Sequence, residues 1–133
     1  MATLPFVTTI FLLWSTAVMS MEVWLYSHGS NGKFTIDTIQ RCYTLKSLWN
    51  DRAVRATWKK LPKHSAIVFY EDARCSGEKI TSWNAPTGSC SFEDDTSKKL
   101  NEEVSSFMVF TTDEGPYMGY EEITVDDPGS IFD

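Results

Sequence analysis

The chain has 133 residues, of which 42% are apolar, and its net charge is −6. Residues 22–112 hold all 12 basic residues and 11 acidic ones, whereas residues 113–133 hold seven acids and no base. A nearly neutral body with an acidic tail argues against nucleic-acid binding, which depends on clustered positive charge.

Residues 1–20 contain no charged side chain, and residues 4–14 are mostly apolar. Small residues, including Ala17 and Ser20, follow this apolar run. The pattern predicts a secretory signal peptide over residues 1–20 that is cut after Ala17 or Ser20. A retained transmembrane anchor is the weaker alternative, because a spanning helix needs about 20 apolar residues. We therefore expect a secreted, extracellular protein whose residues 21–112 form one domain.

Alternating apolar and polar side chains predict strands in the first half of this domain. Residues 42–49 are read as a strand or a tight apolar corner, and residues 51–60 as a strand rather than one helical turn. The predicted strands cover residues 22–27, 33–40, 42–49 and 51–60.

The second half is read in the same way, with the strongest strand at residues 65–70. Residues 84–88 hold proline and glycine and form a predicted loop, and residues 93–103 form an exposed loop with a helical turn at 97–100. Since no segment suits a crossover helix, we expect antiparallel pairing in two packed sheets. The predicted strands cover residues 65–70, 78–83, 89–92 and 105–111.

Two hairpins share one pattern, an aromatic residue followed by a glycine. Tyr70 precedes Gly77 by seven residues, and Tyr26 precedes Gly32 by six. We expect the aromatic ring to pack on the bend and the glycine to adopt a backbone angle closed to other residues. The repetition predicts a small, duplicated, all-β domain.

The acidic tail, residues 113–133, is rich in glycine, proline and aspartate. Such a composition buries little apolar area, so we expect a mostly disordered, flexible tail. Its interspersed apolar residues, Ile123 and Val125 among them, are candidates for docking on the body or on a partner.

Three cysteines follow the signal segment, at Cys42, Cys75 and Cys90. In an oxidising compartment two of them should pair, and the sequence alone leaves all three pairings open. The remaining cysteine is either buried or linked to a second chain. A metal site built on them is not expected, because the spacing lacks Cys-x-x-Cys.

Catalytic groups are sparse. His28 and His64 are the two histidines, and both lie in predicted turns. The carboxylate clusters at residues 71–72 and 93–95 are read as solvated loop charges rather than as a glycosidase pair. We therefore expect a protein that is not an enzyme.

Residues 69–72, Gly77, Trp83 and the segment 105–109 form one recognisable pattern in the second half. This pattern resembles one Greek-key motif of the βγ-crystallin superfamily, and residues 22–65 resemble a second motif more loosely. The resemblance implies a two-sheet Greek-key sandwich. The motif positions carried over from the superfamily are Tyr26, Gly32, Tyr70, Gly77 and Ser105.

Single-domain secreted members of that superfamily include a plant antimicrobial protein, microbial killer toxins and a metalloproteinase inhibitor. Residues 73–77 are similar to the hairpin of the plant antimicrobial type. This resemblance implies a disulfide between Cys42 and Cys75, with Cys90 unpaired or intermolecular, so that the protein is a monomer or a dimer through Cys90.

The same superfamily often binds calcium through an Asn/Asp-Asn/Asp-x-x-Ser/Thr-Ser pattern. The resemblance extends to residues 101–106, where Asn101, Glu102, Ser105 and Ser106 nearly fit. The segment matched to it in the first half, residues 60–65, offers lysines instead of carboxylates. Because the lysine side chains would repel calcium, we expect no metal or cofactor. We interpret Ser105 as a hydrogen-bonding partner of the folded hairpin of the other motif.

These observations predict a secreted, non-enzymatic βγ-crystallin-like protein that binds a protein, glycan or membrane target in defence, as a toxin or as an effector. A protease inhibitor is one alternative, with residues 84–88 as the inserting loop. A calcium-binding module is the other.

Overall fold

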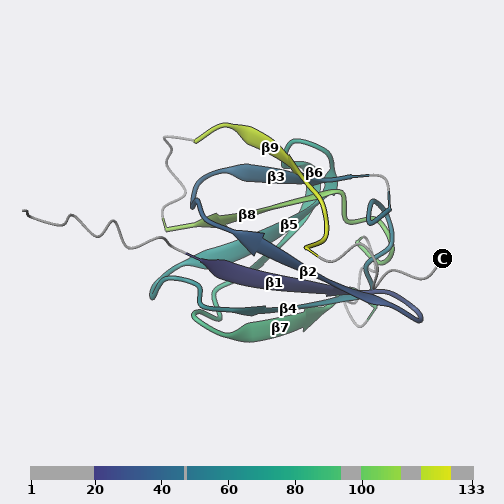
Figure 1. Ribbon diagram of the computed structural model, residues 1–133, viewed down its shortest axis with the longest axis horizontal. Coiled ribbons are helices and arrows are strands. Elements are labelled where there is room, and N and C mark those ends of the chain that lie inside the picture. The colour runs from purple at the N-terminus through teal and green to yellow at the C-terminus, as the bar shows by residue number, and fades with distance from the viewer. Residues whose placement is uncertain (1–19, 47, 94–99, 112–117, 127–133) are drawn as a thin grey trace, which may run out of the picture.

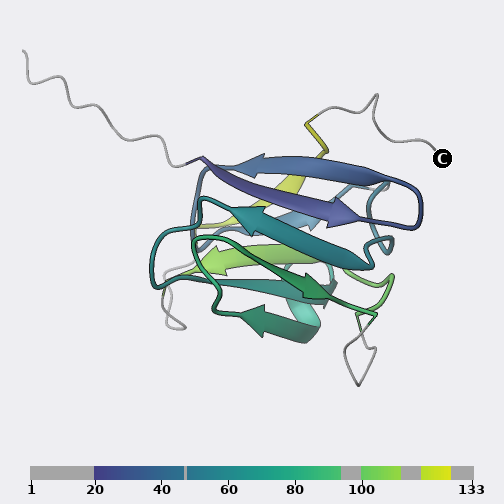
Figure 2. The same ribbon diagram turned by 90° about the horizontal axis from the view of Figure 1, so that it is seen from below.

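The computed structural model describes residues 20–46, 48–93, 100–111 and 118–126. Apart from Ser20, the predicted signal peptide lies outside these residues, as does the helical turn expected before Leu100. Within them the chain forms two β-sheets and no helix, which confirms the all-β, two-sheet prediction (Figures 1 and 2). The strands are β1 (Met21–Tyr26), β2 (Asn31–Ile36), β3 (Cys42–Leu45), β4 (Arg55–Lys59), β5 (Ala66–Asp72), β6 (Ser76–Ser82), β7 (Gly88–Ser91), β8 (Ser106–Phe110) and β9 (Tyr120–Ile123).

The two sheets have matching strand orders, β2-β1-β4-β7 and β6-β5-β8-β3-β9. Replacing β1, β2, β4 and β7 by β5, β6, β8 and β3 converts the first order into the first four strands of the second. In these matching four-strand sets, three strands come from one half of the chain and one from the other, and β9 is added beside β3 at the edge of the second sheet. The halves are therefore interlocked, and neither can complete its sheet alone.

A shared core lies between the sheets. Alternation in β1 places Val23 and Leu25 inward with no exposed area, as predicted from the sequence. Phe34 of β2 meets Phe107 of β8 edge to face, with ring centroids 6.4 Å apart. Trp58 is also fully buried, and its indole N–H donates to the carbonyl of Asn84 over 2.6 Å. Large aromatic side chains therefore hold the two layers together.

The hairpin glycines differ in what they do. Gly77 has a φ of +82°, as expected, and Gly29 has a φ of +116°. Gly32 has no positive φ; instead, a Cβ at this position would lie 2.8 Å from the Trp49 ring. The expectation for Gly32 is therefore wrong in its cause: close packing, rather than backbone conformation, calls for glycine there.

The acidic tail contains a strand, contrary to the expected flexible segment. β9 pairs in parallel with β3, the register running from Cys42 opposite Tyr120 to Leu45 opposite Ile123. Ile123 and Val125 are buried in the core, and the Asp126 N–H donates to the Lys33 carbonyl over 2.8 Å. Residues 118–126 thus belong to the fold, while residues 113–117 and 127–133 of the predicted tail lie outside the described residues.

Candidate functional site

Two equivalent loops meet at one end of the sheets, one before β4 and one before β8. Asp51 and Glu102 occupy the same place in these loops, with φ values of 60° and 57°. Their backbones bond reciprocally: the Asp51 N–H donates to Val104 over 3.1 Å, and the Glu102 N–H donates to Ala53 over 3.0 Å. The segment equivalent to residues 101–106 is therefore residues 50–55.

This pairing corrects the sequence match. Residues 60–65, which were matched to 101–106, instead connect β4 to β5, and Lys60 lies 3.7 Å from Glu22. The true counterpart begins with Asn50 and Asp51, which are acceptable oxygen donors for a cation. The objection to calcium that rested on lysines at this place is removed.

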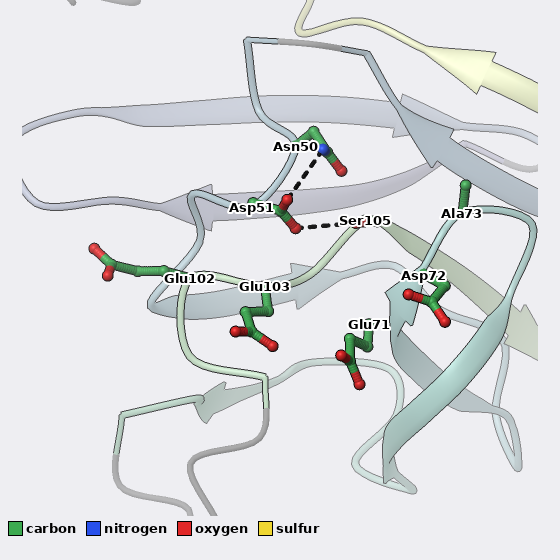
Figure 3. A pocket seen from close by; sticks show the side chains of 8 residues that line it. All are labelled: Asn50, Asp51, Glu71, Asp72, Ala73, Glu102, Glu103 and Ser105. Carbon is green, nitrogen blue, oxygen red and sulfur yellow. Dashed lines mark hydrogen bonds between the residues drawn. The ribbon is translucent and has the colours of Figure 1, made fainter.

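An open pocket of about 510 Å³ lies where these loops approach the β5–β6 hairpin (Figure 3). The Ser105 hydroxyl donates to Asp51 over 3.1 Å, and the Asn50 amide donates to the same carboxylate over 3.3 Å. No lysine, arginine or histidine is among the described residues that line the pocket. The lining residues are Asn50, Asp51, Glu71, Asp72, Ala73, Glu102, Glu103 and Ser105.

An oxygen-rich, acidic lining suits a hard cation such as Ca²⁺. The carboxylates do not converge, however: Glu102 points away from the middle of the pocket in Figure 3. Within the part of the chain that the structure describes, no three His, Cys, Asp or Glu side chains are grouped closely enough to hold a metal ion. The pocket concentrates negative charge without a ready-made coordination sphere.

The two sides of the paired loops are unlike. Ser105 contacts Asp51 on one side, whereas Val54 takes the equivalent place on the other and offers no hydroxyl. His28, 65% exposed, lies 3.0 Å from Glu93 and 3.8 Å from Glu102. The Ser105 side therefore sets a hydroxyl beside the Asp51 carboxylate, whereas a histidine approaches the Glu102 carboxylate on the other side. The side-chain oxygen of Asn101, the residue equivalent to Asn50, is buried with no hydrogen-bond partner among the described residues.

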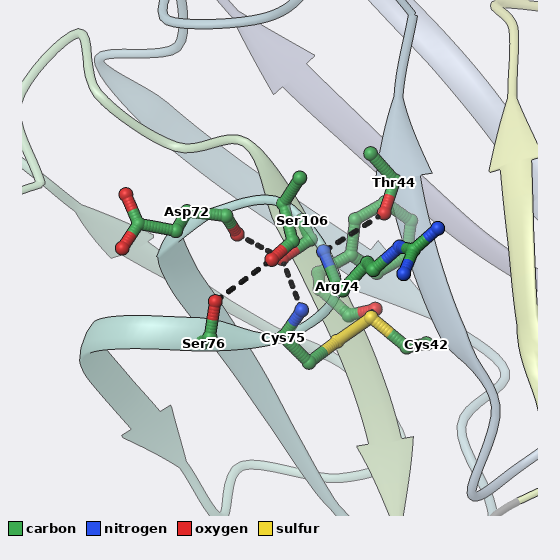
Figure 4. Close-up of a disulfide and its surroundings, with 9 residues drawn as sticks. Cys42, Thr44, Asp72, Arg74, Cys75, Ser76 and Ser106 are labelled. Atoms are coloured by element: carbon green, nitrogen blue, oxygen red, sulfur yellow. Dashed lines mark hydrogen bonds between the residues drawn. A yellow bond between two sulfur atoms is a disulfide. The ribbon is translucent and has the colours of Figure 1, made fainter.

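The Ser105 hydroxyl was expected to bond the hairpin of the other half, but it donates to Asp51 instead. Ser106 is the serine that fixes a hairpin, the one between β5 and β6. The Ser106 hydroxyl donates to the Asp72 carbonyl over 2.5 Å and accepts from the Cys75 N–H over 2.9 Å (Figure 4). This hairpin belongs to the same half of the chain as Ser106, rather than to the partner half. Arg74 and Cys75 have φ values of 60° and 54°, so the bend needs such external support.

A disulfide joins Cys42 of β3 to Cys75 of the hairpin, which confirms the pairing implied by the resemblance. Cys90 is the free cysteine, half-buried on β7 and packed against the core. Burial raises the pKa of the Cys90 thiol to about 12, so this thiol stays protonated and unreactive near neutral pH.

The loop considered for protease insertion is tied to the body at several points. The Leu61 N–H donates to the Pro86 carbonyl over 3.1 Å, and Trp58 donates to the Asn84 carbonyl. The side chains of Asn84, Pro86 and Thr87 are exposed. The loop is thus held in place by its backbone while its side chains face solvent.

Comparison of the chain with family models, curated proteins and solved structures finds no match. Across the described residues, no helix has the length and hydropathy required to cross a bilayer. The candidate groups are therefore interpreted from their own geometry. Asn50 and Asp51 were not predicted from the sequence because residues 60–65 were matched to residues 101–106, which places the counterpart ten residues too far along the chain.

Proposed function

We propose that this chain is a secreted, non-enzymatic domain of the βγ-crystallin type that acts by binding, in defence, as a toxin or as an effector. The observation that carries the proposal is the pair of matching strand orders, in which each half lends one strand to the other sheet. Two Greek-key motifs that exchange their third strands would have this order. The folded hairpin and its disulfide support the same assignment.

Secretion is supported by the Cys42–Cys75 disulfide, since such bonds persist in oxidising compartments. The test is expression of the full chain in a secreting host, followed by non-reducing mass spectrometry of the medium. We expect a species lacking residues 1–17 or 1–20 that carries one disulfide and one thiol. Retention of the whole chain in the cell would contradict the proposal, as would a secreted species with three free thiols and no disulfide.

The binding role is tested by screening the secreted form against microbial surface components, glycans and membranes, with a protease panel in parallel. Binding that leaves every protease active supports the primary proposal. Inhibition abolished by substitutions at the tethered, exposed loop residues Pro86 and Thr87 would instead identify an inhibitor.

Calcium binding at the acidic pocket is a second candidate, and the specific observation in its favour is the Asp51–Ser105 contact between equivalent loops. A cation that bridges these loops would stabilise the folded state by mass action. Millimolar calcium should raise the melting temperature of the wild type, and Asp51→Asn should remove the rise. Glu122→Gln, an exposed substitution on β9, serves as the control. An unchanged melting temperature of the wild type would eliminate calcium.

A further inference from the structure

The outer face of the four-stranded sheet carries a cluster of aromatic and basic side chains. Because Val23 and Leu25 point into the core, the alternation of β1 turns Glu22, Trp24 and Tyr26 outward. All three are half-buried rather than fully exposed. Their neighbours on β2 and β4 therefore decide the chemistry of this face.

The strand register places a cation beside each of these outward residues. Lys33 of β2 lies opposite Trp24, Lys59 of β4 lies opposite Glu22, and Arg55 of β4 lies opposite Tyr26. We call Lys33, Arg55, Lys59 and Lys60, with Trp24 and Tyr26, the basic face.

The aromatic rings hold these cations in place. The Lys33 and Lys59 ammonium groups lie over the Trp24 ring, 5.5 and 5.4 Å from its centroid. The Arg55 guanidinium lies 4.3 Å from the centroid of the Tyr26 ring. Cation–π attraction of this kind restricts long, flexible side chains without neutralising them. The positive charges are thus partly ordered before any partner arrives.

The basic face keeps a net positive charge in an otherwise acidic protein. It holds four cations, and Glu22, which lies 3.1 Å from Lys33 and 3.7 Å from Lys60, is one carboxylate among them. The hydrogen bond from Lys33 lowers the pKa of Glu22, so this carboxyl is ionised and offsets one charge. Asp126 accepts from the hydroxyl of Thr35, which points outward like Lys33 and lies opposite Glu22. It therefore offsets a second charge, and four cations less two carboxylates leave the face a net charge of +2. Since the whole chain has a charge of −6, its acidity lies elsewhere.

The surroundings discriminate between polyanions. Nucleic acids bind to such sheets by stacking bases on open aromatic rings, but here cations already cover the rings. Membrane insertion requires exposed apolar side chains, and the large exposed ones among the described residues, Leu48, Trp83, Met118 and Tyr120, all lie off this face. A flat array of ordered cations instead suits a chain of sulfate or carboxylate groups that has no rings to stack.

We propose that the basic face binds an anionic polysaccharide, and that sulfated glycans are the polysaccharides it binds most tightly. This inference deepens the proposed binding role by naming the class of partner, and it does not involve the acidic pocket. The charge–charge contacts should make the affinity fall steeply with salt concentration.

The test uses the secreted, disulfide-bonded protein and heparin as the probe, on a column and by calorimetry. We expect retention on heparin to higher salt than on a plain sulfonate resin. Lys33→Gln/Lys59→Gln should raise the Kd by about tenfold, because two ordered charges are lost. Lys46→Gln/Lys79→Gln removes the same charge from exposed sites off the face and should leave the Kd nearly unchanged.

A second variant, Arg55→Gln/Lys60→Gln, removes the other two cations of the face and tests the same prediction if the first variant misfolds. Thermal unfolding is recorded for all variants. Equal losses for the face and the control variants would overturn the proposal, as would equal elution from heparin and from sulfonate resin. Tighter binding to a single-stranded oligonucleotide or to phosphatidylserine vesicles would assign the face to another partner and also overturn it. Any of these failures leaves secretion, the disulfide and the proposed fold type standing, since mass spectrometry tests those separately.

Discussion

At the scale of single residues, Cys90 decides whether two copies of this chain can be covalently linked. It lies on β7 opposite Ala56, which has no exposed area, and it packs against the core. The raised pKa keeps its thiol protonated, while disulfide exchange requires the thiolate. We therefore expect the half-buried Cys90 thiol to stay unlinked rather than to join two chains.

We predict that iodoacetamide does not modify Cys90 in the native protein at pH 8 but modifies it fully after unfolding. The thiol also makes stability depend on pH. Its pKa is near 9.0 in the unfolded chain and about 12 in the folded one, so the unfolded state loses the proton first. Stability should therefore fall between pH 9 and 12, by up to about 1.4 kcal/mol per pH unit from this group. Cys90→Ser should flatten the slope, measured by denaturant unfolding. Rapid alkylation of the native protein would contradict this assignment.

Ser106 illustrates how one atom supports a strained bend. Its hydroxyl has no exposed area and serves both Asp72 and Cys75. Ser106→Ala should destabilise the protein by about 1–3 kcal/mol, because the Cys75 N–H loses its partner. Ser76→Ala removes an exposed hydroxyl that bonds Ala73 within the same hairpin and should cost less. Equal losses of melting temperature for the two variants would argue against a special role of Ser106.

The neighbouring serines also show where sequence reasoning stops at this scale. Successive residues of a strand point to opposite faces, so a shift of one position exchanges their surroundings. Ser105 faces the acidic pocket, and Ser106 faces the hairpin. A motif match accurate to one residue predicts that a serine is needed but not which contact it makes.

At the scale of elements, β9 is the part of the described fold that the sequence did not predict. Its acidic side chains suggested solvation, and a parallel neighbour was not expected without a crossover helix. The alternation of Ile123 and Val125 was the available signal. Two buried side chains and a short parallel register are enough to hold β9 in the sheet, because β3 already offers an edge with which it can pair. The longer, strongly alternating strands were predictable because their periodicity is a property of the chain alone.

We predict that Ile123→Ala lowers the free energy of unfolding by about 2 kcal/mol or more, because truncating this buried side chain would leave a cavity in the core. Thr124→Ala, the exposed neighbour, should change it by less than about 0.5 kcal/mol. Both values follow from urea unfolding monitored by tryptophan fluorescence. Indistinguishable midpoints for the two variants would mean that residues 118–126 do not pack on the body.

At the scale of the whole molecule, the fold depends on contacts between its halves. β3 completes the sheet of the second half, β7 completes the sheet of the first, and the paired loops at Asp51 and Glu102 bond reciprocally. The repetition in the sequence predicts two similar halves, but the exchange of strands depends on pairing between distant segments. The Cys42–Cys75 disulfide is the covalent form of the same connection, because it joins a strand of one half to the hairpin of the other.

The disulfide should therefore stabilise the molecule as a whole. Its cysteines are 33 residues apart, for which the loss of unfolded-chain entropy corresponds to about 3–4 kcal/mol. We predict that Cys42→Ser/Cys75→Ser lowers the free energy of unfolding by about this amount in a single cooperative transition, because the interlocked sheets unfold together. A reductant should lower the stability of the wild type similarly and leave the double variant unaffected. Two separate transitions in the variant would instead show that the halves are independent units, and interlocking would no longer explain their stability.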